Sequence, residues 1–322
     1  MREKVVLFNA FLMFLLSAML GAKLVIPAVS VPDIITVPED CLTIREAILA
    51  AGPGDTIVVR EGLYAEGEIV VAKPLTLRAE GEVIVDGLHT AWSVFCVESD
   101  GVVIDGFIVK NARYAGISLY EVDNCRIQGN AVTNVDGHGI HIEGCNNIVE
   151  GNTILNNDVG IYLIGMFFLT SHNVIQKNIV ESSSWGIDII YSDHNVIRQN
   201  TLNGNSNASI FLFFSDYNSI NENKVKKNGQ LGMALTVSHH NLVNENKVTN
   251  NGIGIGLSGS GWNTVEENKV NRNALYGIAL YSSYACNTIK KNVALGNKEF
   301  DLYWDGTGYN TWIENIHKTR NW

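Results

Sequence analysis

The sequence predicts an all-β solenoid, a single-stranded parallel β-helix with three short strands in each of about ten coils. A skeleton of the form N-x-V-x-x-N-x-V-x-x-N, followed by G-I-x-L, recurs every 22–26 residues, and such a fixed period is typical of solenoids. Apolar residues alternate with polar or small ones inside each unit, which indicates strands. No unit has an apolar stripe at helical spacing. The repeats start at Asn147, Asn173, Asn195, Asn218, Asn241, Asn263, Asn287 and Asn310.

The unit at 241–263 shows how one coil forms. Val243 and Val248 lie in short runs separated by Asn246, and Ile255 and Leu257 alternate with small residues. Parallel strands stack about 4.8 Å apart, so equivalent residues of successive coils form columns. The predicted core is the set of inward pairs Ile140/Ile142, Ile161/Leu163, Ile187/Ile189, Ile210/Leu212, Met233/Leu235, Ile255/Leu257 and Ile278/Leu280.

The asparagines form three columns of their own. One is the column of repeat starts, and the second runs from Asn130 to Asn315 at the same period. A looser third column contains Asn157, Asn205, Asn228, Asn251, Asn273 and Asn297. Asn accepts left-handed backbone at a bend and carries both a donor and an acceptor. We therefore predict amide ladders from coil to coil, and prefer them to a glycan-binding role because their spacing follows the bends.

Composition limits the partners. The chain has 322 residues, 46% hydrophobic, with a net charge of −10, and a solenoid of this length is one domain. No basic patch is apparent, which argues against nucleic acid. An acidic surface repels polyanionic glycans unless a cation such as Ca²⁺ intervenes. No cofactor is evident, and copper is disfavoured because grouped His, Met and Cys ligands are missing.

Residues 1–30 read as a signal peptide or an N-terminal anchor. Arg2 and Lys4 precede an apolar run from Val5 to Ala22, which has the pattern of an export signal. No second such run follows. The expected location is therefore secreted or at the cell surface, with membrane contact only through this segment.

Residues 31–88 are predicted to contain the N-terminal cap and the first coils. Thr43 and Glu46 make a capping box, followed by an amphipathic helix that Gly52 would end. A turn then leads to a strand at Thr56–Val59. A helix laid across the first coil would cover its open core and unpaired backbone.

These N-terminal residues carry a family resemblance. The stretch T-I-R-E-A-I at 43–48, then P-G-D-T-I-V-V at 53–59 and K-P-L-T-L-R-A-E-G at 73–81 resemble the cap and first coils of the pectin-lyase-like superfamily. The Asn-rich repeats resemble NosD-type parallel β-helix repeats of carbohydrate-binding and sugar-hydrolase proteins. The resemblance covers about 36–316 and implies a right-handed β-helix. It also implies three kinds of function: glycan binding, lyase or epimerase chemistry, and accessory work in copper-centre maturation.

Residues 89–316 are predicted to form the β-helix repeats, and 317–322 a C-terminal tail. The longest coil has an apolar insertion at 165–169, either a ligand lip or a tip folded on its own coil. Trp312, Ile316 and Trp322 are expected to cover the C-terminal end. An uncovered end would offer an edge for oligomer formation.

Two cysteines are predicted to lie near each other. Cys125 and Cys145 fall near the same bend of adjacent coils. They are compatible with a disulfide, and equally with two buried thiols.

The G-I-x-L strand has outward positions where chemistry can occur. His141, Tyr162 and Asp188 fall on successive coils, with Glu143 beside His141. Histidine, tyrosine and a carboxylate can serve as base, acid and charge neutraliser when a proton is removed beside a uronate carboxylate. These three are the candidate catalytic residues for a polysaccharide lyase or epimerase.

The same face also offers a non-catalytic strip, and this is the preferred hypothesis because no required catalytic motif is present. Flat aromatic faces beside polar groups suit a polysaccharide. The candidate binding residues are Tyr120, Glu143, Tyr162, Phe211, Phe213 and Tyr281. In the outward columns, Asp301 and Tyr303 are expected to follow Ala279 and Tyr281. The chain is therefore predicted to be an exported glycan-binding or scaffold protein, with the lyase or epimerase and the NosD-type accessory protein as alternatives.

Overall fold

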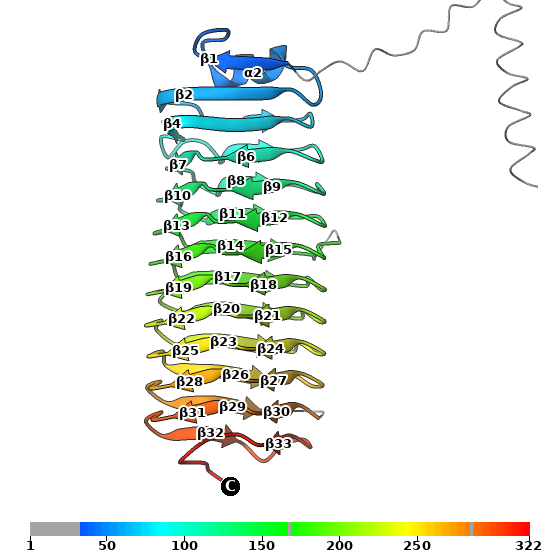
Figure 1. The fold of residues 1–322 in the computed structure, drawn as a ribbon, viewed down its shortest axis with the longest axis vertical. Coiled ribbons are helices and arrows are strands. Elements are labelled where there is room, and N and C mark those ends of the chain that lie inside the picture. Colours follow the sequence, from blue (N-terminus) through cyan, green and yellow to red (C-terminus); the bar gives the residue numbers. More distant parts are fainter. Residues whose placement is uncertain (1–32, 167–168, 284–285) are drawn as a thin grey trace, which may run out of the picture. The chain divides into compact units, whose positions relative to one another are not determined.

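The computed structural model describes residues 33–166, 169–283 and 286–322. The predicted signal segment, 1–30, and the centre of the apolar insertion, Phe167 and Phe168, lie outside these ranges. Residues 33–322 form one compact unit, a column of stacked coils (Figure 1). The predicted parallel β-helix is confirmed, since the strands of successive coils pair in parallel throughout the described residues, as between β23 (Leu231–Thr236) and β26 (Ile253–Ser258).

Two sheets make the walls of the column. Sheet B has 11 strands and one side of sheet A has 13, so the described residues make about twelve coils where about ten are predicted. Its strands are β3 (Ile69–Val71), β5 (Ser93–Val97), β8 (Ala115–Leu119), β11 (His138–Ile142), β14 (Val159–Ile164), β17 (Trp185–Ile190), β20 (Ala208–Phe213), β23, β26, β29 (Tyr276–Tyr281) and β32 (Phe300–Trp304).

Sheet A has 22 strands and folds around the other two sides of the column. One side contains β1 (Ile34–Val37), β2 (Thr56–Tyr64), β4 (Thr76–Asp86), β6 (Val103–Asp105), β9 (Arg126–Gln128), β12 (Ile148–Glu150), β15 (Val174–Gln176), β18 (Val196–Arg198), β21 (Ser219–Asn221), β24 (Leu242–Asn244), β27 (Thr264–Glu266), β30 (Thr288–Lys290) and β33 (Thr311–Ile313). The long strands β2 and β4 turn the corner, so that their C-terminal parts lie on the other side. That side also contains β7 (Ile108–Lys110), β10 (Ala131–Thr133), β13 (Thr153–Leu155), β16 (Ile179–Glu181), β19 (Thr201–Asn203), β22 (Lys224–Lys226), β25 (Lys247–Thr249), β28 (Lys269–Asn271) and β31 (Val293–Leu295).

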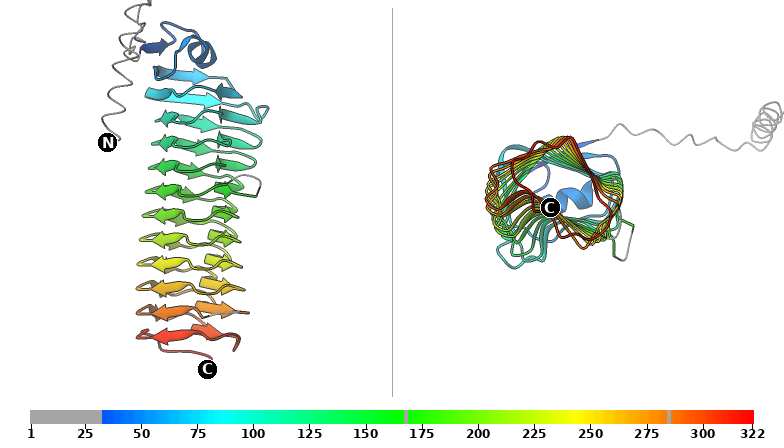
Figure 2. Two further views of the ribbon diagram at one scale, coloured as in Figure 1. Left: turned by 90° about the vertical axis from the view of Figure 1, so that its right-hand side faces the viewer. Right: turned by 90° about the horizontal axis from the view of Figure 1, so that it is seen from below.

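The N-terminal cap forms largely as predicted. Helix α2 (Ile44–Ala50) begins with a complete capping box between Thr43 and Glu46, and it lies across the interior when the column is seen along its axis (Figure 2). Two boundaries were predicted wrongly. Extended Ala51 caps the helix in place of Gly52, and β2 continues to Tyr64 because it pairs along its length with β4. Within the described part of the chain, no helix could span a membrane.

The predicted asparagine ladders are confirmed. The side-chain oxygen of Asn246 accepts from the backbone N–H of Asn223 at 2.9 Å and from its amide at 3.0 Å. The amide nitrogen of Asn246 donates to the Ile220 carbonyl at 2.8 Å and to Asn268 Oδ1 at 3.0 Å. At a bend, backbone groups lose their hydrogen-bond partners on the neighbouring strand, and buried backbone groups need partners. The side chain of each buried Asn supplies these hydrogen bonds.

The glycine of the G-I-x-L motif has a packing reason. A Cβ on Gly254 would lie 2.3 Å from Val270 Cγ1 and 2.5 Å from the backbone oxygen of Gly277 in the next coil. Two residues later, a Cβ on Gly256 meets only Ile253 Cγ2, at 3.9 Å. The glycine at the first position therefore lets successive coils approach each other.

We expect Gly254→Ala to destabilise the protein by about 1–3 kcal/mol, because the colliding groups belong to the core and the backbone. Urea unfolding followed by circular dichroism measures the loss. Gly256→Ala is the matched control and should change the unfolding free energy little, since the register partners of Gly256 are already Ala234 and Ala279. Equal losses in the two variants would contradict this explanation.

The C-terminal residues fold back on the last coil. Asp301 accepts from the backbone N–H of Lys318 at 2.9 Å, and Arg320 forms a β-bridge with Leu302. Trp312 and Trp322 are in contact, with ring centroids 4.6 Å apart. The indoles thus lie at the end as predicted, whereas Ile316 is 59% exposed. An oligomer through this end remains a prediction.

The cysteines are all free thiols. The Cys125 thiol donates to the Ser99 carbonyl, and Cys145 contacts the Leu169 carbonyl. Burial raises the pKa of Cys125 to about 11. The sequence left open a Cys125–Cys145 disulfide or two buried thiols. The structure has free thiols at both positions, with Cys125 buried and Cys145 half-buried.

Candidate functional site

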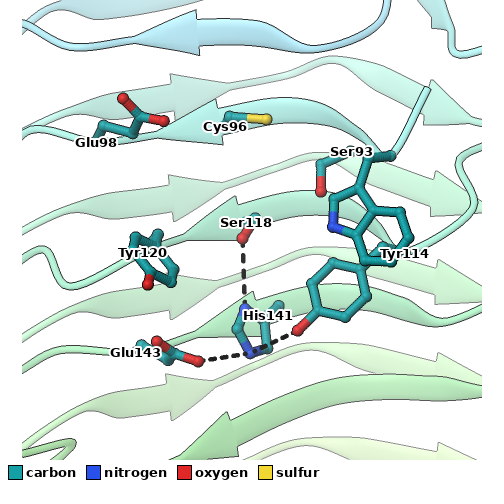
Figure 3. A pocket seen from close by; sticks show the side chains of 9 residues that line it. Ser93, Cys96, Glu98, Tyr114, Ser118, Tyr120, His141 and Glu143 are labelled. Atoms are coloured by element: carbon teal, nitrogen blue, oxygen red, sulfur yellow. Dashed lines mark hydrogen bonds and ion pairs between the residues drawn. The ribbon is translucent and has the colours of Figure 1, made fainter. Parts of the chain in front are cut away.

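A pocket of about 320 Å³ opens on the outer face of sheet B, over β5, β8 and β11. We call it the aromatic pocket. Its wall comes from three successive coils and from the bends that precede β5 and β8 (Figure 3). The lining residues are Trp92, Ser93, Cys96, Glu98, Tyr114, Ser118, Tyr120, His141 and Glu143.

His141 is the innermost polar residue of the pocket. It points outward from β11, because its neighbours Ile140 and Ile142 occupy the core. Nε2 lies 3.3 Å from the Tyr114 hydroxyl and 3.5 Å from Glu143 Oε1, and Nδ1 lies 3.4 Å from Ser118 Oγ (Figure 3). The structure places His141 outward, as predicted, but buries its side chain. His141 is only 1% exposed, because neighbouring rings cover it.

Burial sets the charge state of this cluster. Desolvation, with a smaller effect of His138, lowers the pKa of His141 to about 3, so the imidazole is neutral at neutral pH. Burial also raises the pKa of Glu143, with help from Glu121, and that of Tyr114, with help from Glu143. The pocket floor therefore presents a neutral imidazole and an un-ionised phenol, which act as hydrogen-bond donors and acceptors.

One wall of the pocket is flat and aromatic. Trp92 and Tyr114 stack with centroids 4.9 Å apart and planes at 9°. Both follow bends at equivalent places of two coils, and the Tyr114 N–H donates to the Trp92 carbonyl at 2.7 Å. The Trp92 side is open, since that residue is 57% exposed. A flat apolar face beside polar groups is the usual layout of a sugar site.

The charged residues of the pocket are all acidic. Glu98 and Glu143 line it, and the lining contains no Lys or Arg. An anionic ligand would therefore meet repulsion here. The arrangement suits a neutral ligand that carries several hydroxyl groups.

The three predicted catalytic residues stack in register but do not share the pocket. His141 pairs with Tyr162, and Tyr162 with Asp188, on successive strands. The Tyr162 ring stacks on His138 at 4.4 Å and lies 5.6 Å from His141, and burial chiefly raises its pKa to about 12. Only His141 lines the aromatic pocket.

Asp188 is buried in an apolar setting. Its side chain lies between Tyr162 and Phe211 in the column. It is 8% exposed, and its Oδ1 has no hydrogen-bond partner. Burial raises its pKa to about 7. This carboxyl is covered, so it does not reach a ligand in the aromatic pocket.

The predicted binding strip is divided by the structure. Tyr120 and Glu143 line the aromatic pocket. Phe211 and Phe213 form a separate patch on β20, their rings 6.2 Å apart, and Tyr281 contacts Tyr303 near the C-terminal end.

The register predicted for the last coil was wrong. Tyr303 pairs with Ala279, while Asp301 is buried against the C-terminal residues. Leu302 has to fill the core position below Ile278, and this fixes the register.

Trp92, Tyr114 and Glu98 were not found from the sequence. They lie in early coils before the regular repeat begins, so no column pointed to them. A weak signal was available, because Trp92 and Tyr114 both stand just before a strand of sheet B, 22 residues apart.

A second aromatic array runs down the corner that follows sheet B. Five rings stack there on successive coils at centroid distances of 5.2, 5.0, 4.8 and 5.2 Å. Each residue has left-handed backbone and directly precedes a ladder asparagine. Because the ring faces cover each other, the array stabilises the corner and exposes mainly ring edges. Its members are His172, His194, Tyr217, His240 and Trp262.

Metal ligands are not grouped in the part of the chain that the structure describes. No set of three or more His, Cys, Asp or Glu side chains there could hold a metal ion. The adjacent residues His239 and His240 lie at a bend, and His240 is taken up by the ring array.

Comparison with known proteins gives one family and one curated relative. A family model for a right handed beta helix region matches residues 92–230 and 164–294, together more than half of the chain. A cell surface glycoprotein of Methanothermus fervidus is 27% identical, in a match that covers 46% of this chain. The match covers 35% of that protein, so the chain spans about a third of its relative's length.

Solved structures share the fold at low identity. The A-module of the mannuronan C-5 epimerase AlgE4 of Azotobacter vinelandii has a TM-score of 0.65 at 16% identity, covering 84% of this chain and 88% of that one. The periplasmic alginate epimerase AlgG has a TM-score of 0.60 at 17% identity, and the match covers 81% of this chain and 76% of that one. The Dettilon tailspike protein has a TM-score of 0.62 at 14% identity, and the match covers 87% of this chain and 68% of that one. At these identities the likeness shows the fold alone.

Proposed function

Because the chain belongs to the family of right-handed β-helix proteins, we propose that it is an extracellular surface protein that binds a glycan in the aromatic pocket. The observation that carries the proposal is the stacked Trp92–Tyr114 wall beside the hydrogen-bonding group of His141. Sugar rings pack on flat aromatic faces and hydrogen-bond at their edges. The surface location is supported by the similarity to the Methanothermus fervidus cell surface glycoprotein.

The acidic lining narrows the ligand to a neutral sugar. Glu98 and Glu143 would repel a uronate and can accept hydrogen bonds from sugar hydroxyls. His141, buried behind them, holds the Tyr114 and Ser118 hydroxyl groups in place through its two ring nitrogens. Tyr162 and Asp188 do not line the pocket, so two of the three candidate catalytic residues are not beside a ligand bound there. The contacts with the aromatic wall and the polar lining are sufficient for binding without catalysis.

The test is an array of neutral and uronate polysaccharides probed with the purified protein, followed by titration of the best binder. We expect Trp92→Ala to weaken binding about tenfold or more, because a large flat contact is lost. Trp262→Ala is the matched control, since Trp262 is 55% exposed, close to the 57% of Trp92, and lies outside the pocket. Absence of neutral-glycan binding, or equal losses in both variants, would reject the proposal.

A polysaccharide lyase or epimerase is the second candidate function. It is favoured by the neutral His141 imidazole beside the Tyr114 hydroxyl, a pair that can take and return a proton. The lining offers no cation to neutralise a uronate carboxylate. Turnover of a uronate polymer that His141→Ala abolishes would establish this function, and its absence would leave binding.

A further inference from the structure

A column of lysines crosses sheet A on strands β22, β25 and β28. These three strands follow one another along the column in Figure 1. Lys224 pairs directly with Lys247, and Lys247 with Lys269. The sequence shows no basic patch because these residues lie 22–23 positions apart, and the coil period brings them together. Like charges directly opposite each other on neighbouring strands destabilise a sheet. Such a column therefore has a cost that needs an explanation.

The lysines have no ionic partner within the described residues. The ion pairs found there involve other lysines, such as Lys177 with Glu150 and Lys290 with Glu266. Three further cations adjoin the column, at the end of β22 and at the corner after β28: Lys226, Lys227 and Arg272. Six positive groups thus lie on three successive coils of a protein whose net charge is −10.

Two adjoining pockets form a groove along this column. One, of about 300 Å³, is lined by Thr201, Lys224, Val225, Lys226, Lys247 and Thr249. The other, of about 550 Å³, shares two of these residues and is lined by Lys247, Thr249, Asn250, Asn271, Arg272 and Leu295. The lining reaches from β19 to β31, roughly 19 Å at the strand spacing. It contains hydroxyl, amide and cationic groups and no carboxylate.

A row of glutamates flanks the groove without lining it. Glu222, Glu245 and Glu267 stand at the corner two residues before the lysines. They limit how far the positive potential extends, so the groove attracts a ligand that lies within it.

We propose that this groove binds a linear acidic polysaccharide that runs along the column axis. Carboxylates of the chain would pair with the lysines, and its hydroxyl groups with the Thr and Asn side chains. No aromatic residue lines the groove, so it lacks the surfaces on which nucleic acid bases stack. This site is separate from the aromatic pocket. The groove would favour an anionic ligand, whereas the acidic lining of the aromatic pocket repels one.

The test uses a carboxylated homogalacturonan oligosaccharide and its fully methyl-esterified form as the uncharged control. Calorimetric titration of the whole protein should show binding of the carboxylated form only, weakening as salt is added. The triple variant Lys224→Gln/Lys226→Gln/Lys247→Gln removes three cations that line the groove and should lose about tenfold or more in affinity. Lys177→Gln/Lys290→Gln/Lys291→Gln removes the same charge outside the groove and should change affinity less than about twofold.

A stability measurement separates binding from misfolding. Lys247→Gln removes the central charge and should raise the thermal midpoint of the free protein by about 1–2 °C while weakening binding. Trp92→Ala should leave binding of the acidic oligosaccharide intact, so failure of the aromatic pocket is distinguishable from failure of the groove. No binding of the carboxylated form, equal losses in the two triple variants, or tighter binding of a single-stranded oligonucleotide would overturn the proposal.

Discussion

Asn246→Ala is expected to lower the free energy of unfolding by about 4 kcal/mol. The side chain is 1% exposed and hydrogen-bonds the backbone N–H of Asn223 and the Ile220 carbonyl. Alanine leaves both backbone groups buried without partners, at about 1–3 kcal/mol each, and interrupts the amide ladder. Urea unfolding measured by circular dichroism and by tryptophan fluorescence would give the loss.

The control lies two residues earlier in the same coil. The Asn244 side chain has a buried Oδ1 that makes no hydrogen bond, so Asn244→Ala removes no partner from the backbone. We expect this change to cost less than about 1 kcal/mol. If Asn246→Ala lowered the free energy of unfolding as little as Asn244→Ala does, the asparagine ladders would not be the interaction that stabilises the bends.

Asp188→Asn is expected to change how stability depends on pH. The carboxyl has a pKa of about 7 in the folded protein, chiefly because of burial, and an ordinary low value once unfolded. Between about pH 4 and pH 7 the folded state therefore binds the extra proton. The stability that Asp188 contributes is fully present below about pH 4 and is lost as the pH rises through 7.

Asparagine stays neutral throughout, so the variant escapes this loss. Relative to the variant, the wild-type protein should lose up to about 4 kcal/mol between pH 4 and pH 8. Burial holds the pKa values of His138 and His141 low, so the stability that these histidines contribute changes with pH in the opposite direction. Both proteins carry the two histidines, so this contribution cancels in the comparison. Unfolding free energies measured at half-unit pH steps test this. Parallel curves for the two proteins would show that Asp188 is not buried as described.

The periodic part of the fold could be predicted from the sequence because the repeat encodes backbone shape directly. Asn246 and its equivalents mark bends, and Ile255 and Leu257 mark a strand with one buried face. The cap was predictable for a local reason, since Thr43 and Glu46 complete their hydrogen bonds within one turn. Its end was not, because the neighbouring coil lengthens β2 and Ala51 ends the helix without a left-handed glycine.

The candidate site was predictable only in part. His141, Glu143 and Tyr120 were expected on one face, and the structure places all three in one pocket. Their main partners, Tyr114 and Trp92, come from bends of the irregular early coils, where no repeat frame aligns the residues.

The sequence by itself determined the coil, its core and its asparagine ladders, because each depends on spacing along the chain. Only the tertiary structure decided what covers each outward side chain. Rings on adjacent coils bury His141 and Asp188, whereas Lys224, Lys247 and Lys269 stay exposed side by side. Periodicity fixes which residues become neighbours, but the size and direction of the neighbouring side chains set burial, charge state and access.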